Sequence, residues 1–312
     1  MVKLVSVLTE NWTMTDPRDL GRIVRMAQEA EDAGFDMVML SDHVLLGPSA
    51  GDQGRMENPR DYAMPGNQDP AYAWPSSMVM LAAIAAVTSR IRLGAIALIT
   101  PLRNPLVLAK DLATLDLLSE GRLVIQPTVS WHRDEYEAIG VPFNRRGKIL
   151  DEQLAIFAEV WRHSPASFHG EFFNFDDVFL EPKPYRPQGP AMWFGGQSLT
   201  PAVLNRLLKY GSGYHPVGRA QPEDVLVLEQ GLRSVGKSLS DVEMIGGTRV
   251  EFPDPHSVAP LDVALEEIPR QRELGFTTFA IKPSIFIDDV DDHATFCKDV
   301  VQRVDALTRG LS

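Results

Sequence analysis

The amino-acid sequence predicts a closed (β/α)8 barrel, the TIM-barrel class, on three observations. Short apolar segments alternate with longer amphipathic segments, eight of the short segments have the composition of strands, and no G-x-G-x-x-G motif follows the first of them. Strands separated by helices of this length need right-handed crossovers, so they form a parallel sheet, and eight such strands favour closure. The missing glycine motif argues against an open, doubly wound sheet. We expect residues 1–312 to form one domain with two insertions.

The first unit of the barrel is the most clearly marked. KLVSVLTE (3–10) is rich in β-branched residues and leucine, as is typical of a strand that is buried on both faces. Asp16 precedes Pro17, which predicts a helix N-cap followed by proline at the first helical position. Gly34 marks the end of that helix, because glycine readily adopts the left-handed conformation found there. The second strand is expected at FDMVML (35–40).

The later elements repeat this alternation. Apolar residues at helical spacing predict the helices, and runs of β-branched and aromatic residues predict the strands. The strand signals weaken after about two thirds of the chain. The predicted helices cover 75–90, 104–121 and 145–162, the clear strands cover 91–99, 122–129 and 191–196, and the weaker strands cover 212–217, 242–252 and 276–283.

Two segments interrupt the alternation. Residues 44–74 are rich in Gly, Pro, Asn and Asp, and so long a loop in a compact domain is usually functional or disordered. Residues 164–190 contain alternating aromatic residues, which predict a hairpin inserted before the fifth strand.

The composition restricts the partners of this chain. Forty-two acidic and 30 basic residues give a formal net charge of -12, which disfavours nucleic acid, and Cys297 is the only cysteine. Neither an internal disulfide nor a cysteine-based zinc site can therefore form. The apolar region 78–99 contains Arg90 and Arg92, which a membrane helix would not carry at its middle. These features predict a cytoplasmic protein without a membrane or nucleic-acid partner.

The residues that follow the predicted strands are candidates for chemistry, because the C-terminal strand ends of such a barrel form the rim that holds the active site. His43 follows the second strand and could act as an acid or base near neutrality, the alternative being a capped surface histidine. Glu10 offers a carboxylate, and Trp12 and Trp131 could form the wall of a pocket. Asp42 with His43 lacks the further ligands that a metal site requires, so no metal is expected.

A different kind of site is suggested by FGGQSLTP (194–201). Two glycines end a predicted strand, Thr200 can cap the next helix, and Pro201 takes its first position. Backbone N–H groups would then be exposed beside the positive end of a helix. This arrangement suits an anion such as a phosphate, although a plain tight turn would have the same sequence.

Five stretches of the sequence resemble, in the same order, the bacterial luciferase-like superfamily of flavin monooxygenases and deazaflavin (coenzyme F420)-dependent oxidoreductases. The resemblance covers most of residues 1–216 and weakens afterwards. It implies a (β/α)8 barrel with an insertion before the fifth strand, in agreement with the alternation of elements. The stretches are AEDAGFDMVMLSDH (30–43), SRIRLGAIALITPLRNPLVLAKDLATLDLLSEGRLVI (89–125), EYEAIGVPFNRRGKILDEQLAIFAEVW (135–161), FHGEFFNF (168–175) and MWFGGQS (192–198).

The resemblance also implies a flavin-type cofactor. In relatives that use the deazaflavin, an Asp-His pair lies against the cofactor ring, and its histidine is a proposed acid or base. A glycine pair after the fifth strand holds the cofactor phosphate, and a non-prolyl cis peptide in the third strand forms a bulge behind the ring. The cofactor-binding residues implied here are Asp42, His43, Ile96, Ala97, Leu98, Ser130, Trp131, Gly195, Gly196, Gln197 and Ser198.

One stretch departs from the family pattern. After the fourth strand many relatives have a glycine-rich turn, whereas this chain reads VIQPTVSWH (124–132). The bulky side chains of Gln126 and Thr128 should change the contact with the cofactor. The sugar-phosphate dehydrogenases of the family place a catalytic glutamate where Trp131 stands, which argues against that activity.

Together these observations predict an oxidoreductase that transfers a hydride between coenzyme F420 and a small organic substrate, with His43 or Glu10 handling the proton. Loop 44–74 would close the pocket. An FMN-dependent two-component monooxygenase of the same fold is one alternative, and a non-catalytic flavin-binding protein is another. The resemblance further implies a homodimer, since relatives commonly pair through helices near the second and third strands. The predicted walls of the substrate pocket are Trp12, Trp74 and Trp131.

Overall fold

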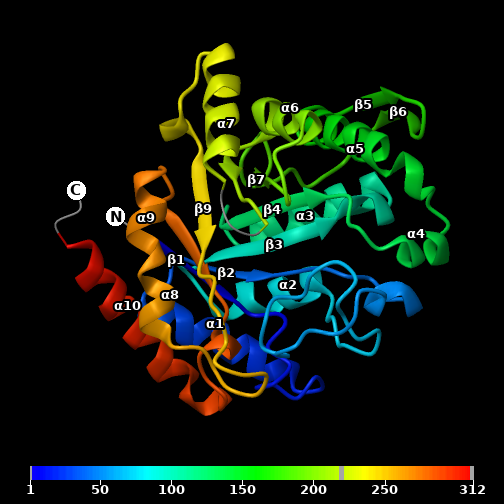
Figure 1. Cartoon of the computed structure of the whole chain (residues 1–312). Helices are drawn as coiled ribbons and strands as arrows, with labels where there is room; N and C mark the ends of the chain where they lie inside the picture. Colours follow the sequence, from blue (N-terminus) through cyan, green and yellow to red (C-terminus); the bar gives the residue numbers. More distant parts are fainter. Residues whose placement is uncertain (1, 218–220, 310–312) are drawn as a thin grey trace.

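The computed structural model describes residues 2–217 and 221–309, and its centre is a closed barrel of eight parallel strands (Figure 1). The barrel fold predicted from the sequence is confirmed. Each strand pairs in parallel with both of its neighbours. In order around the barrel the strands are β1 (Lys3–Val7), β10 (Thr278–Ile281), β9 (Glu243–Gly247), β8 (Gly213–Tyr214), β7 (Ala191–Phe194), β4 (Leu123–Thr128), β3 (Arg92–Ile99) and β2 (Met37–Leu40).

Helices cover the outside of the barrel, as the alternating pattern requires (Figure 1). The helix that follows β1 packs against the last helix of the described chain, so the first and last units are neighbours. The helices are α1 (Leu20–Ala33), α2 (Ser77–Val87), α3 (Pro105–Leu118), α4 (Arg133–Ile139), α5 (Arg146–Val160), α6 (Pro201–Tyr210), α7 (Pro222–Ser234), α8 (Leu261–Leu265), α9 (Glu267–Glu273) and α10 (His293–Thr308).

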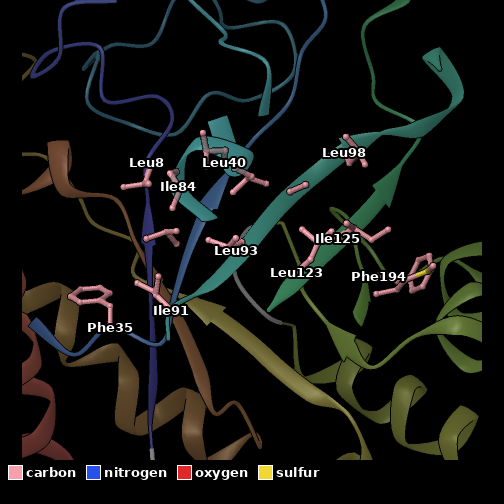
Figure 2. Packing of buried hydrophobic residues seen from close by; sticks show 14 of the residues in the cluster. Leu8, Phe35, Leu40, Ile84, Ile91, Leu93, Leu98, Leu123, Ile125 and Phe194 are labelled. Carbon is pink, nitrogen blue, oxygen red and sulfur yellow. The ribbon is translucent and has the colours of Figure 1, made fainter. Parts of the chain in front are cut away.

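Apolar side chains form separate clusters inside and outside the barrel wall, because successive residues of a strand point to opposite faces. Met37 and Trp193 belong to the cluster in the interior of the barrel, and both side chains are fully buried. Leu40, Leu93 and Leu98 belong to the outer cluster with helix residues such as those of α2 (Figure 2). Both faces of the strands are therefore buried, which explains why the strand segments read as nearly continuous apolar runs.

A polar network closes the end of the barrel at which the strands begin. Glu243 accepts two hydrogen bonds from Arg92, both of 2.9 Å, and one of 2.8 Å from Thr278. Lys3 adds a contact of 3.1 Å. Burial alone would raise the pKa of Glu243, but the hydrogen bonds and charge of Arg92, with Thr278 and Lys3, lower it to about 2. These four residues link the first positions of four strands.

The start of the first helix differs from the sequence prediction. Asp16 does not cap the helix; its carboxylate accepts from the backbone N–H of Arg18 at 2.8 Å in the preceding turn. The helix begins at Leu20, where Asp19 is the N-cap and accepts from the N–H of Arg22 at 3.0 Å. Two aspartates three residues apart can both form such local bonds, and the pattern did not distinguish them.

The two insertions have different structures. Residues 41–76 separate β2 from α2 and contain one short 3-10 turn, Pro48–Gly51. The second insertion forms the predicted hairpin, in which β5 (Ala166–His169) pairs in antiparallel fashion with β6 (Asn174–Val178) near α5 (Figure 1). Helix α4 lay in a stretch for which no helix was predicted. None of the helices in the described ranges is both long enough and apolar enough to cross a membrane.

Candidate active site

A pocket of about 810 Å³ opens at the C-terminal ends of the barrel strands, where the fold class places its active sites. Residues from the ends of all eight strands and from the loop 41–76 line it, so the pocket lies between the barrel rim and the first insertion. Most of the residues selected from the sequence meet here. They are Glu10, Asp42, His43, Trp74, Ile96, Ala97, Ser130, Trp131, Gly195, Gly196, Gln197 and Ser198.

His43 is held by a buried carboxylate. Its Nδ1 lies 3.3 Å from Oε2 of Glu135 on α4, and the Glu135 side chain is fully buried. The other oxygen of Glu135 accepts from the backbone N–H groups of Val44 and Leu45. A carboxylate at Nδ1 favours the tautomer in which that nitrogen carries the proton. The Nε2 atom of His43 is then the basic nitrogen of a residue that lines the pocket.

Asp42 has a structural role next to His43. Its carboxylate accepts two hydrogen bonds from Arg103, of 2.8 and 2.9 Å, and one of 3.0 Å from the backbone N–H of Ile99. The bidentate pair neutralises this buried acid. Asp42 thereby ties the end of β2 to the end of β3 and fixes the position of His43. No cluster of three or more potential metal ligands occurs among the described residues.

Glu10 connects the rim to the first insertion. Its Oε2 accepts from the backbone N–H of Ala63 at 2.8 Å and lies 3.7 Å from Nζ of Lys282. Lys282 is fully buried and also donates to the backbone carbonyl of Asp61 at 2.6 Å. Burial lowers the pKa of Lys282 to about 8, although Glu10 and Asp61 oppose the change. Both residues therefore hold segment 61–63 over the pocket.

The third strand carries a non-prolyl cis peptide bond between Ile96 and Ala97. The register with β4 shifts at this point, so the strand bulges at the rim. Ile96 and Ala97 line the pocket. Leu98 does not reach it, because the bulge turns this side chain outward into the cluster beneath the helices, where it is fully buried.

A polar cradle follows β7. Thr200 caps α6 and accepts from the N–H of Val203 at 3.4 Å, and Pro201 takes the first helical position, as predicted. A Cβ on Gly195 would overlap the backbone carbonyl of His215, so only glycine fits there. A Cβ on Gly196 would meet nothing closer than the Ser198 carbonyl at 3.8 Å. This glycine therefore leaves open space beside the positive end of a helix, which suits a phosphate.

The three predicted tryptophans have different surroundings. Trp131 and Trp74 line the pocket, with ring centroids 6.0 and 5.0 Å from that of His43. Trp12 lies behind them, stacked on Tyr72 at 4.0 Å and packed edge-on against Trp74 at 5.3 Å. Trp12 thus supports the pocket wall and is not among the lining residues.

The stretch that departs from the family pattern forms a buried pair. Oε1 of Gln126 on β4 lies 2.7 Å from Nδ1 of His215, which follows β8. Burial lowers the pKa of His215 to about 4, so its imidazole is neutral near pH 7 and donates from Nδ1 to the amide oxygen. Both residues line the pocket. The bulk of Gln126 is therefore accommodated by a hydrogen bond across the rim.

Several polar residues of the pocket were not selected from the sequence. Some follow the weaker strands and others lie on α4, α5 and α6, and they come close to the rim only when the barrel closes. Applying the strand-end rule to those weaker strands would have found three of them. Four of these unselected residues line the pocket, namely Arg146, Arg206, His215 and Arg249. Two others, Glu135 and Lys282, contact residues that line it.

Comparison with known proteins agrees with this geometry. A family profile described as luciferase-like monooxygenase matches residues 1–259. An FMNH(2)-dependent dimethylsulfone monooxygenase of Pseudomonas putida is 28% identical over 177 residues, which are 56% of this chain and 43% of the relative. The chain thus spans about two fifths of the length of that curated relative.

Solved structures share the whole barrel. The monooxygenase RslO1 from Streptomyces bottropensis superposes with a TM-score of 0.73 at 19% identity, covering 96% of this chain and 99% of that one. An F420-dependent secondary alcohol dehydrogenase, solved with an F420-acetone adduct, gives a TM-score of 0.70 at 16% identity, covering 97% and 99%. At these identities the likeness establishes the fold, whereas the profile match establishes the family. The chain belongs to the luciferase-like monooxygenase family.

Proposed function

We propose that this protein is an oxidoreductase that uses the deazaflavin coenzyme F420 to reduce or oxidise a small organic substrate. The observation that carries the proposal is the pairing of His43 with buried Glu135 inside a pocket that also contains a bulged strand end and a glycine cradle. When bound, the deazaflavin would supply or accept the hydride, and the protein would supply position and proton transfer.

The residues present fit a cofactor of this kind. Gly195 and Gly196, with Gln197 and Ser198, would hold its phosphate, because Gly196 leaves room that a side chain would fill. Ile96 and Ala97 would support one face of the ring system. The volume of about 810 Å³ is within the range of small-molecule sites.

His43 would exchange the proton with the substrate through Nε2. The Glu135 carboxylate lies 3.3 Å from Nδ1 and orients the ring, as an acid held behind an imidazole does in other enzymes. Glu10 has a different part in this proposal. Its two oxygens already accept from Ala63 and Ser41, so Glu10 mainly holds the loop that excludes water.

The FMN-dependent monooxygenase is the second candidate, and the named relative from Pseudomonas putida favours it. The two candidates differ in their reaction with oxygen, because reduced FMN reacts with oxygen productively and the deazaflavin does not. Oxygen consumption with the reduced cofactor therefore separates them. A protein that binds the cofactor but turns over no substrate would match the non-catalytic alternative.

The experiment is a pair of fluorescence titrations of the purified protein, one with F420 and one with FMN. We expect saturable binding of F420, with FMN at least about tenfold weaker. His43→Ala should retain cofactor binding within about threefold and lose proton-dependent turnover. His163→Ala, an exposed histidine paired with Glu159, is the matched control. Preference for FMN would establish the second candidate, and binding of neither would refute the proposal.

We further propose a homodimer. Helices α2 and α3 are neighbours and carry exposed apolar residues, including Val79 at 68% and Val107 at 61% exposure. Exposed apolar residues on neighbouring helices often mark an interface. A second copy of the chain is the expected occupant, which agrees with the arrangement implied by the resemblance.

A further inference from the structure

The charged groups of the pocket are not balanced. Asp42 is neutralised by Arg103, and Glu10 faces Lys282 at 3.7 Å. Arg206, at the cradle, pairs with Asp151 at 2.7 Å. Asp42, Glu10 and Arg206 line the pocket, and each is therefore paired with a group of opposite charge.

Two guanidinium groups remain. Arg146 donates to the backbone carbonyl of Phe143 at 2.9 Å, and Arg249 lies 5.6 Å from the ring centroid of Tyr62. Within residues 2–217 and 221–309, no carboxylate forms an ion pair with either of them. The pocket therefore carries two unneutralised positive charges in a chain whose formal net charge is -12. Such a pocket can bind two anionic groups.

The two arginines occupy different parts of the rim. Arg146 begins α5, which follows β4, and β4 is the neighbour of the strand that leads into the glycine cradle. Arg249 follows β9, which lies four strands from β3 in either direction around the barrel. Arg249 is consequently opposite the Ile96–Ala97 bulge. A ring supported by that bulge would present its other face toward the side of the pocket that holds Arg249.

We infer that Arg249 binds an anionic group of the substrate, and that the substrate is a small organic carboxylate. The inference rests on the proposed function, because it assigns the cradle and Arg146 to the cofactor and leaves Arg249 for the second ligand. The guanidinium offers a planar pair of N–H donors that matches a carboxylate. Tyr62 lies against this group, and burial followed by the charge of Glu10 raises the pKa of the phenol, so Tyr62 stays neutral and adds no competing anion.

The test uses benzoate and benzamide, two probes of equal size that differ in charge. Calorimetric titration of the full chain should detect saturable binding of benzoate and at least about tenfold weaker binding of benzamide. Arg249→Gln should weaken benzoate binding at least about tenfold, and Arg249→Lys should recover part of the loss. Arg25→Gln, at an exposed arginine of α1 that pairs with Asp19, is the matched control and should leave benzoate binding unchanged. Arg146→Gln is measured in parallel. Circular dichroism confirms that each variant is folded.

Other outcomes of the benzoate titrations overturn the inference. Equal binding of benzoate and benzamide, or benzoate binding that survives Arg249→Gln, would mean that Arg249 selects no anion. Loss of benzoate binding in Arg146→Gln alone would place the anion at the cradle. Titration of the same variants with F420 and FMN separates this inference from the proposed function. If neither cofactor binds while benzoate still depends on Arg249, the proposed function fails and the carboxylate site stands. If Arg249→Gln weakens a cofactor as much as benzoate, Arg249 belongs to the cofactor site.

Discussion

The polar network around Glu243, at the end of the barrel where the strands begin, leads to a prediction that separates stability from function. Arg92, Thr278 and Lys3 lower the pKa of this half-buried acid from 4.5 to about 2, against the opposing effect of burial. One pKa unit corresponds to about 1.4 kcal/mol, so the folded environment stabilises the carboxylate by about 3 kcal/mol. Glu243→Gln removes the charge and leaves Arg92 without its counter-ion. We expect a loss of about 3 kcal/mol in the free energy of unfolding at pH 7.

The pH dependence gives the prediction its sharpest form. An acid whose folded pKa is depressed contributes stability above its unfolded pKa and loses that contribution as the pH falls toward the folded value. Urea unfolding of the wild type and of Glu243→Gln should therefore differ by about 3 kcal/mol at pH 7 and converge as the pH falls from 4.5 toward 2. Because other carboxylates titrate in both proteins, the difference between the two isolates Glu243.

Two controls accompany this measurement. Glu137→Gln removes an exposed ion pair with Arg133 and should cost less than about 0.5 kcal/mol. Glu243 lies at the end of the barrel opposite the pocket, so its substitution should leave the cofactor dissociation constant unchanged within about twofold. A loss below about 1 kcal/mol at pH 7, or a difference that persists unchanged at low pH, would refute the reasoning.

Three further predictions concern the rim and the surface. Gly195→Ala should prevent correct folding, whereas Gly196→Ala should fold normally, as followed by thermal unfolding. Gly196→Ala should nevertheless bind the cofactor at least about tenfold more weakly than the wild type in a fluorescence titration, and equal binding by the two proteins would exclude the cradle. Burial lowers the pKa of Lys282 from 10.5 to about 8, so between these pH values the unfolded chain binds more protons than the folded one. The stability of the wild type relative to Lys282→Met should therefore rise from pH 8 to 10.5, and a difference in urea unfolding that stays constant over this range would contradict the prediction. Joint substitution of Val79 and Val107 by Asp should convert a dimer into a folded monomer in light scattering, and a dimer that survives would exclude this face.

The sequence alone determined the barrel and the general position of the site. The alternation of strands and helices depends on local periodicity, which is present in any short window of the chain, so the fold class could be predicted without contacts. The strand-end rule selected His43, Glu10 and Trp131, and all three line one pocket. The cis peptide between Ile96 and Ala97 falls within the range that the resemblance implied.

Contacts between distant segments could not be predicted. Glu135 lies 92 positions from His43, and Lys282 lies far beyond Glu10 in the chain, yet each pair meets at the rim. Nothing in the local pattern of either residue indicates its partner. The same limit applies to Asp42, whose partner Arg103 lies 61 positions further along the chain.

Side-chain direction at the rim was also decided only by the tertiary structure. Leu98 faces the outer core because the bulge in β3 shifts the register, and a shift of one residue reverses which face a side chain occupies. Trp12 is withdrawn from the pocket by stacking on Tyr72, a residue of the first insertion. Periodicity thus determined which segments form the barrel, whereas closure of the barrel and packing of the insertion decided which side chains face the pocket, because those contacts join residues that are remote in sequence.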